Sequence, residues 1–323
     1  MAGLLRAVLV GLFSLAASLA PSSAADVYPN RPVRWLIGFP AGGPVDTVAR
    51  IMSQSLSEHF GQQFVVENRA GSGGNIATEA AIHSTPDGYT LLFSGANNAI
   101  SASLYRKLPF DFIRDTVPVA LFTEVPNLLA VSNALPVKSV QELIDYCKTY
   151  PGKLSYASSG NGTTLHMSAE LFKAMTKCEM VHVPYRGSAL AYPDLISNKV
   201  QLIFDNLPTA MAQAHGGSVR ALGVTSPQRW PSLPDVPAVA ETVPGFDATV
   251  YYGMSAPKGT PPEIVDILNK AVNEALRDPA VIERFAAIGG VPKPMTSSGY
   301  GEMISQQTEK WRKVVEFAGV SVE

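Results

Sequence analysis

The sequence predicts an α/β fold with two lobes, each a mostly parallel sheet flanked by helices, and a ligand cleft between them. Three observations support this prediction. Apolar runs of strand length alternate with helical patterns along most of the chain, an order typical of parallel sheets covered by helices. The chain has 323 residues, enough for two domains of ordinary size. Two separate glycine-rich loops each follow a predicted strand and precede a predicted helix.

The first 25 residues have the pattern of a secretory signal peptide. Arg6 precedes an apolar run over 7–20, and small residues follow as far as Ala25. This matches a charged start, an apolar core and a small-residue cleavage site. We predict cleavage after Ala25, with Ser23 and Ala25 in the two positions that require small residues. The alternative is an uncleaved membrane anchor, but the apolar core is short for a span of about 20 residues.

The first lobe begins with alternating strands and helices. Residues 33–37 form an apolar run typical of a strand, and 46–60 carry apolar side chains at helical spacing. Gly61 ends this helix in the way that glycine commonly does. A strand, a helix and a strand follow, at 63–67, 76–84 and 89–93. This order with short connections predicts a parallel sheet with helices on both faces.

A second strand–helix series follows and leads to the C-terminal helices. The proline-rich stretch RWPSLPDVP, residues 229–237, interrupts it and is expected to be irregular. The other predicted strands are 119–121, 128–131, 154–157, 181–183, 202–204, 220–224 and 250–256, and the other predicted helices are 139–149, 165–175, 189–198, 262–276, 280–287 and 299–318. We predict one lobe from 26–124 with 232–323, a second from 125–231, and two crossing strands between them.

The composition argues against a nucleic-acid partner. Hydrophobic residues make up 46% of the chain and charged residues 16%, and the formal net charge is −2. No block of like charge is visible in the sequence. Binding of DNA or RNA would need a basic stripe, and none is visible either. We therefore expect no nucleic acid among the partners.

The two cysteines, Cys147 and Cys178, leave two alternatives open. They could form one disulfide in an oxidising compartment. They could also remain two buried thiols, because a sequence does not give the distance between them.

The stretch GFPAGGPVD, residues 38–46, joins the first strand to the first helix. A phosphate-binding P-loop would need a lysine and a hydroxyl after its last glycine, but proline and valine follow Gly43. The dinucleotide fingerprint also fails, because Gly42 and Gly43 are adjacent, and Asp46 would repel a multiply charged phosphate. Backbone N–H groups at a helix N-terminus remain, which suit one carboxylate. The alternative is a glycine turn needed only for packing.

The stretch SSGNGTTLH, residues 158–166, repeats this arrangement in the other lobe. Gly160 and Gly162 permit close approach of a ligand to the backbone. Thr163 and Thr164 stand where helix caps and hydroxyl donors belong. A ligand with an acceptor at each end could therefore touch both loops.

A metal site and a serine hydrolase are the competing interpretations. His166 and Glu170 are four residues apart on one predicted helix, but a metal site usually needs three or four ligands. No other histidine or cysteine clusters with them in the sequence, so we predict no metal and a hydrogen-bonded His166 near the helix start. The nucleophile elbow G-x-S-x-G does not occur. An enzyme stays an open alternative, because catalytic triads are assembled in space.

Further residues at strand ends could complete the cleft. Ser94 and Asn97 follow one predicted strand with small hydrogen-bonding groups, and Asp205 follows another, where it would hold an ordered water or a ligand donor. Arg186 follows the predicted strand at 181–183 and places a guanidinium beside a candidate loop. It is either a clamp for an anionic ligand or a solvated side chain.

Seven blocks of the sequence resemble the signature of a known family. In chain order they are YPNRPVRWLIGFPAGGPVDTVAR, FVVENRAGSGGNIATEAA, PDGYTLLFSG, LPFDF, SSGNGTTLH, VHVPYRGSA and PDVPAVAE. They are similar to blocks of the Bug-type (TctC-like) receptors, the extracytoplasmic solute-binding proteins of tripartite tricarboxylate transporters. The resemblance extends from Tyr28 to about Val320.

The resemblance implies a two-lobed type II periplasmic-binding-protein fold without catalysis, cofactor or metal. It implies that backbone amides and hydroxyls of the loops at 39–46 and 159–166 bind carboxylates, with contacts on Ala41, Gly42, Gly43, Gly162, Thr163 and Thr164 and with Asp46 and Asp205 supporting the site. The predicted ligand-binding set also includes Phe39, Ser94, Asn97, Ser159, Asn161, His166 and Arg186. Ala41 departs from the family pattern, since a second proline is common there, and Trp35 replaces a small aliphatic residue.

These features together predict a monomeric periplasmic receptor. It would capture a small carboxylate, either a di- or tricarboxylate or an aromatic carboxylate, and deliver it to integral membrane subunits of a tripartite tricarboxylate-type transporter. Two alternatives remain open, a periplasmic ligand sensor that feeds a signalling partner and a secreted hydrolase. The sequence does not identify the carboxylate.

Overall fold

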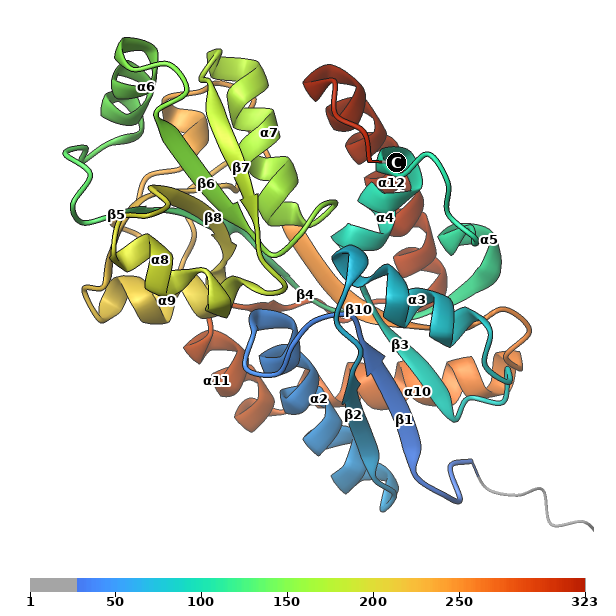
Figure 1. Ribbon diagram of the computed structural model, residues 1–323. Coiled ribbons are helices and arrows are strands. Elements are labelled where there is room, and N and C mark those ends of the chain that lie inside the picture. The colour runs from blue at the N-terminus through green and yellow to red at the C-terminus, as the bar shows by residue number, and fades with distance from the viewer. Residues whose placement is uncertain (1–27, 323) are drawn as a thin grey trace, which may run out of the picture. The chain divides into compact units, whose positions relative to one another are not determined.

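The computed structural model describes residues 28–322 (Figure 1). The predicted signal peptide over 1–25 and its cleavage after Ala25 lie outside these residues. Over the described residues, no helix combines the length and the apolar character that a membrane span needs.

The first sheet contains strands from both ends of the described chain. They are β1 (Val33–Ile37), β2 (Phe64–Asn68), β3 (Thr90–Gly95), β4 (Thr116–Val125), β10 (Val250–Pro257) and β11 (Val291–Pro292), in the order β11-β4-β10-β3-β1-β2 across the sheet. β1 runs parallel to β2 and β3, as predicted. β10 runs antiparallel to β3 and β4, and β11 runs antiparallel to β4.

Helices cover the first sheet on both sides (Figure 1). They are α2 (Pro44–Phe60), α3 (Asn75–Ile82), α4 (Ala96–Leu104), α5 (Phe112–Asp115), α10 (Pro262–Ala275), α11 (Pro279–Ala287) and α12 (Ser297–Ala318), with the 3₁₀ turn η1 (Ser72–Gly74) before α3. Gly61 ends α2 in the left-handed conformation, with φ 65°, which confirms the predicted C-cap. Two helices of this set, α4 and α5, were not predicted. α4 follows Gly95 directly and consists largely of small residues.

The second sheet contains strands from the middle of the chain. They are β5 (Asn127–Ser132), β6 (Leu154–Ser158), β7 (Met180–Pro184), β8 (Leu202–Asn206) and β9 (Val219–Val224), in the order β7-β6-β8-β5-β9. β6 runs parallel to β7 and β8, whereas β5 runs antiparallel to β8 and β9. The helices of this part are α6 (Val140–Thr149), α7 (Thr164–Thr176), α8 (Tyr192–Ile196) and α9 (Leu207–His215), with the 3₁₀ turns η2 (Ser188–Leu190) and η3 (Val239–Glu241).

The two-sheet α/β architecture is confirmed, and most strands of each sheet run in one direction. The exceptions are β10 and β11 in the first sheet and β5 in the second, which run against the others. Only Pro126 separates β4 from β5, so one extended segment leaves the first sheet and enters the second. The chain later returns from β9 to β10, which runs in the opposite direction between β3 and β4. A strand that crosses between the sheets is therefore antiparallel to its neighbours, as β5 and β10 are, so each sheet is mixed.

The predicted helix over 189–198 is also different in the structure. It consists of η2 and α8, separated at Ala191. Pro193 lies in the first turn of α8, where its missing N–H is tolerated. A single helix from residue 189 would place the same proline in the second turn, where it would remove a backbone hydrogen bond. The helix α9 was not predicted.

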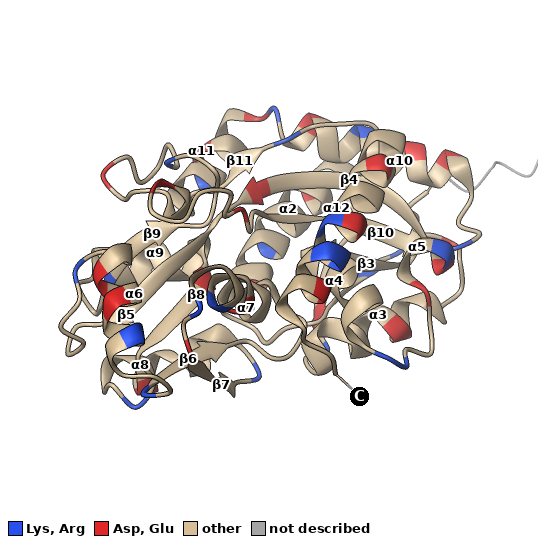
Figure 2. Ribbon diagram, turned by 90° about the horizontal axis from the view of Figure 1, so that it is seen from above, with Lys and Arg blue, Asp and Glu red and all other residues tan. Residues whose placement is uncertain are grey.

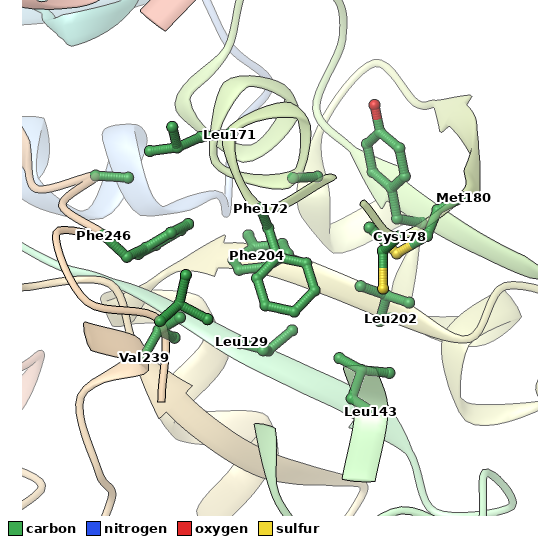
Figure 3. Close-up of a cluster of buried hydrophobic side chains, with 14 of the residues drawn as sticks. Leu129, Leu143, Leu171, Phe172, Cys178, Met180, Leu202, Phe204, Val239 and Phe246 are labelled. Carbon is green, nitrogen blue, oxygen red and sulfur yellow. The ribbon is translucent and has the colours of Figure 1, made fainter. Parts of the chain in front are cut away.

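A cluster of aromatic side chains fills the core beside the second sheet (Figure 3). The rings of Phe172 and Phe204 have centroids 5.6 Å apart, and Phe246 lies 6.3 Å from each. Phe246 belongs to the segment that returns toward β10, so this segment packs into the core of the second sheet. The division of the chain into lobes at residues 124/125 and 231/232 stays a prediction.

The two cysteines lie in this same core. Cys147 and Cys178 are buried free thiols, and Cys147 Sγ donates to the Glu179 carbonyl at 3.7 Å. The structure therefore has the second of the two alternatives that the sequence left open.

Charged residues of both signs are interspersed on the outer helices (Figure 2). On α12, Arg312 pairs with Glu309 at 2.8 Å and with Glu316 one turn further along. Such pairs at helical spacing add little to stability when exposed. In α12 these pairs place positive and negative side chains next to each other.

Candidate ligand-binding site

A cavity lies between loops of the first sheet and loops of the second. It encloses about 650 Å³ of space, part of it open to solvent. The first sheet contributes the loop after β1, the start of α2, the start of α4 and part of β10, and the second contributes the start of α7 and the loop after β7. The lining residues are Phe39, Pro40, Ala41, Gly43, Pro44, Val45, Ala96, Asn97, Ser159, Thr163, Thr164, Leu165, Gly187, Ser188, Ala189, Leu190, Asn206, Val250 and Tyr252.

Part of the predicted binding set lines this cavity. The structure brings together Phe39, Ala41, Gly43, Asn97, Ser159, Thr163 and Thr164 from both glycine-rich loops and the start of α4. The remaining predicted residues, Gly42, Asp46, Ser94, Asn161, Gly162, His166, Arg186 and Asp205, are not among the lining residues. Their positions beside or behind the cavity follow below.

The N-terminus of α2 opens into the cavity. Gly43 is the N-cap, and Pro44 occupies the first turn, where the lack of an N–H is harmless. The first hydrogen bond within the helix runs from the Thr47 N–H to the Gly43 carbonyl, at 3.0 Å. The Val45 N–H, one residue into the helix, thus has no intrahelical partner. It lies beside the cavity with the positive end of the helix dipole.

Asp46 supports this loop from behind and does not line the cavity. Its carboxylate is 3% exposed and accepts hydrogen bonds from the Gly42 N–H at 3.0 Å, Arg50 Nε at 2.8 Å and Asn68 Nδ2 at 3.0 Å. Burial by itself would raise the pKa of Asp46, but these donors hold that pKa below its ordinary value. The Arg50 guanidinium balances its charge, so Asp46 fixes the loop without opposing an anion in the cavity.

The N-terminus of α7 opens into the same cavity. Thr163 is the N-cap, and its hydroxyl donates to the Gly160 carbonyl at 2.8 Å. Thr164 Oγ1 accepts a hydrogen bond from Asn206 Nδ2 at 3.1 Å, so its own hydroxyl hydrogen is left to donate. Because the Met167 N–H makes the first hydrogen bond within the helix, the amides of Thr164 and Leu165 have no intrahelical partner.

The loops of the two sheets touch at the rim of the cavity. The Tyr105 hydroxyl, on the first-sheet side, donates to the Asn161 carbonyl at 3.2 Å. A Cβ on Gly73 would lie 2.3 Å from that same carbonyl oxygen, so only glycine permits this approach. A Cβ on Gly187 would lie 3.0 Å from Pro40 Cγ. Asn161 thus contributes to the contact between the loops.

His166 lies beneath the second loop. It is 6% exposed, its ring stacks on His182 with centroids 4.3 Å apart, and its Nδ1 accepts the Gly162 N–H at 3.4 Å. His182 in turn bonds to Ser158 Oγ at 2.6 Å. Burial lowers the pKa of His166 to about 4 and that of His182 to about 3, so both rings are neutral near pH 7. His166 therefore does not contact the cavity. It stabilises the loop by accepting the hydrogen bond from Gly162.

Lowering the pH should therefore destabilise the protein partly through His166, and we predict that His166→Asn reduces this loss. An unfolded histidine takes up a proton near pH 6.5, whereas the buried ring of His166 does so only near pH 4. The unfolded state binds more protons between these values, so the free energy of unfolding falls as the pH falls from about 6.5 to about 4. Asparagine does not titrate, and its side-chain oxygen can replace Nδ1 as the acceptor.

Urea unfolding of the two proteins at about pH 7 and about pH 4.5 measures this effect, expected to be on the order of 1–3 kcal/mol. Burial raises the pKa of Asp205 to about 6, so Asp205 makes the protein more stable as the pH falls. Because Asp205 is present in both proteins, its contribution cancels in the comparison. The exposed His215 supplies the control, and His215→Asn should behave like the wild type. Equal pH dependence of His166→Asn and wild type would contradict the prediction.

The remaining predicted residues lie at three other places. Asp205 is fully buried behind the cavity and accepts hydrogen bonds from the Tyr192 hydroxyl and the Asn206 N–H, both at 2.8 Å. Ser94 is buried inside the first sheet's core, where its hydroxyl pairs with those of Tyr300 at 2.9 Å and Ser255 at 2.8 Å. Arg186 is exposed beside an adjoining hollow. None of the three reaches the cavity wall.

Three polar residues of the cavity wall were missed by sequence reasoning, Ser188, Asn206 and Tyr252. Asn206 follows Asp205 at the end of β8, and it is the amide of Asn206 that lines the cavity. Tyr252 lies on β10 opposite Gly95, the last residue of β3. The strand-end pattern could have pointed to Asn206. Tyr252 could be found only from the register of β10, which no local pattern shows.

Comparison with known proteins agrees with this geometry. Residues 48–320 match the sequence model of the tripartite tricarboxylate transporter family receptor. Protein BugT of Bordetella pertussis is 37% identical over 317 residues, which are 97% of this chain and 97% of that protein.

Solved structures are similar over the same extent. An R. palustris protein solved with adipate is 38% identical, with 91% of this chain and 99% of that chain covered and a TM-score of 0.88. MatC from Rhodopseudomonas palustris, solved with bound malate, is 32% identical, with 89% and 100% covered and a TM-score of 0.85. Both the family match and the relatives extend over most of the chain, and this chain therefore belongs to the family of tripartite tricarboxylate transporter receptors.

Proposed function

We propose that this protein is a periplasmic receptor that binds a small carboxylate in the cavity between its two sheets. One observation carries the proposal: the N-termini of α2 and α7, from different sheets, open into the same cavity. Each supplies backbone N–H groups and a partial positive charge. The described residues that line the cavity include no lysine or arginine. This arrangement suits a carboxylate better than a multiply charged phosphate.

The remaining cavity wall suits a carbon skeleton. Phe39, Val45, Leu165 and Leu190 present apolar side chains to the same space. An apolar wall with a few convergent donors is the usual form of a small-molecule site. The ligand would then have its carboxylate at the helix ends and its carbon chain or ring against these side chains.

The donors available are sufficient for useful affinity. A micromolar dissociation constant corresponds to about −8 kcal/mol, and a hydrogen bond to a charged group contributes about 1.5–3 kcal/mol. The amides of Val45, Thr164 and Leu165 and the Thr164 hydroxyl could together supply this after the costs of ordering. A ligand that touches both loops also favours the state in which the loops are in contact.

Delivery to membrane subunits of a transporter follows from the family and belongs to this proposal. So do export by the predicted signal peptide, action as a monomer and the absence of catalysis. The proteins solved with adipate and malate make these two acids sensible first probes for this chain.

Calorimetric titration of the mature protein with adipate, malate, citrate, glutamate and benzoate tests the proposal. We expect at least one acid to bind with a dissociation constant of about 1 mM or lower. Sulfate and inorganic phosphate serve as control anions and should bind more weakly than that acid. Absence of binding by the whole set, or preference for phosphate, would contradict the proposed function.

A further inference from the structure

The cavity wall contains two buried hydroxyls without a hydrogen-bond partner among the described residues, those of Ser188 and Tyr252. Ser188 lies next to the carboxylate of Asp205. Tyr252 lines the cavity and is 3% exposed, and its hydroxyl has no hydrogen-bond partner among the described residues. Its ring packs against Phe93, with centroids 5.6 Å apart. Val250, on the same face of β10, and Ala96 line the cavity beside it. A buried hydroxyl without a partner is costly to stability, so its persistence at a binding cavity points to a partner that the ligand supplies.

Three of the neighbouring polar side chains donate hydrogen bonds within the protein, those of Asn206, Thr163 and Asn97. The Asn206 amide donates one hydrogen to Thr164 Oγ1 and the other to Asn127 Oδ1. The Thr163 hydroxyl donates to the Gly160 carbonyl. Asn97 Nδ2 donates to the Gly73 carbonyl, at 3.2 Å. These contacts fix the wall. The Ser188 hydroxyl has the buried Asp205 carboxylate beside it, whereas the Tyr252 hydroxyl has no hydrogen-bond partner among the described residues.

The chemistry of the group makes it a donor. Burial and the nearby charge of Asp205 raise the pKa of Tyr252 well above its ordinary value, so the hydroxyl keeps its proton at neutral pH. A protonated phenol in an apolar wall binds best to an acceptor, such as a carboxylate, carbonyl or hydroxyl oxygen. A ligand with an apolar group next to Tyr252 would leave the Tyr252 hydroxyl without an acceptor.

Tyr252 is also separate from the donors assigned to the ligand carboxylate. Those donors are at the starts of α2 and α7, whereas Tyr252 projects from the middle of a strand in the first sheet. We propose that the Tyr252 hydroxyl donates a hydrogen bond to a second acceptor of the ligand, and that it selects acids with such an acceptor over acids whose far end is apolar. This inference rests on the proposed function.

Two matched pairs of acids test the selection. Adipate and hexanoate have the same number of carbons, but only adipate has a second acceptor group, and malate and butyrate form a second such pair. A site built around a hydrogen bond rejects an analogue that lacks the group. In at least one pair, the wild type should prefer the acid with the second acceptor by about tenfold or more. In Tyr252→Phe the preferred acid should bind about 10- to 100-fold more weakly, while its partner changes less than about threefold.

Tyr251 provides a control on the same strand. Its hydroxyl is also buried without a hydrogen-bond partner, but its ring packs against Tyr300, with centroids 6.2 Å apart, and it does not line the cavity. Tyr251→Phe should leave all four affinities unchanged. Thermal unfolding without ligand separates a structural role from a binding role: Tyr252→Phe should unfold at or above the wild-type temperature, because no protein hydrogen bond is lost.

The outcomes distinguish this inference from the proposed function. A wild-type protein that binds none of the four acids, nor any acid of the larger set above, would overturn both. Binding without preference within either pair, or a preference that persists in Tyr252→Phe, would overturn the role of Tyr252 alone. A loss of preference equal in Tyr251→Phe and Tyr252→Phe would also overturn it.

Discussion

Thr164→Val is expected to weaken binding of the preferred carboxylate by about 10- to 100-fold, the effect of one hydrogen bond to a charged group. Thr164 Oγ1 accepts the Asn206 amide at 3.1 Å, so its hydrogen is free to point at a ligand in the cavity that it lines. Valine has nearly the same shape but no hydroxyl. Calorimetric titration of both proteins with adipate, or with whichever acid of the set binds most tightly, measures the change.

Two further variants show whether the hydroxyl is responsible. Thr164→Ser keeps the hydroxyl and should retain most of the affinity. Thr149→Val makes the same change at an exposed position at the end of α6 and should bind like the wild type. Because valine also leaves the Asn206 amide hydrogen unpaired, we expect a modest loss of thermal stability in Thr164→Val. Wild-type affinity in a folded Thr164→Val protein would rule out this hydroxyl as a ligand contact.

Gly187→Val is expected to weaken binding of the same acid by about 5- to 100-fold, the range expected when an overpacked contact is forced. Gly187 follows β7 in the second part of the chain, and Pro40 follows β1 in the first. Even a single Cβ at Gly187 would lie 3.0 Å from Pro40 Cγ and 3.1 Å from Pro40 Cδ. The branched side chain would keep the two loops apart, so the state with the loops in contact would become less populated.

The fold should tolerate this substitution. The backbone of Gly187 is extended, with φ −173° and ψ 152°, a conformation open to any residue. Gly187→Ala should have a smaller effect than valine, which would give a graded series. Ala134→Val, on an exposed loop after β5, is the matched control. Equal affinity of Gly187→Val and wild type, with both proteins folded, would show that binding does not need this contact.

The candidate site was predictable from sequence where its geometry is local. The starts of α2 and α7 depend on residues within a few positions of each other: Gly43 and Pro44 in one loop, and Thr163 as the cap of the other. Glycine conformation, proline at a helix start and hydroxyl caps act within one turn of backbone. The two loops and the helices that follow them were therefore visible in the sequence.

The roles of several predicted residues were not predictable in the same way. Asp46, Ser94 and His166 have the right chemistry for a ligand site, but each is directed into a network of protein partners. Those partners are Asn68, Tyr300 and Gly162, and two of the three lie far away in the sequence. Whether a polar side chain faces a cavity or a buried partner depends on packing between such distant segments.

The sequence by itself determined the α/β class, the two glycine-rich loops at helix starts and the family resemblance, because strand and helix patterns, turns and caps are encoded in short stretches of chain. The tertiary structure decided the mixed sheets, the contact of Gly187 with Pro40 and the place of Tyr252 in the cavity wall. Each of these depends on the register of β10 or on the approach of loops more than a hundred residues apart. Such arrangements are set by the packing of the whole chain, and no local pattern carries them.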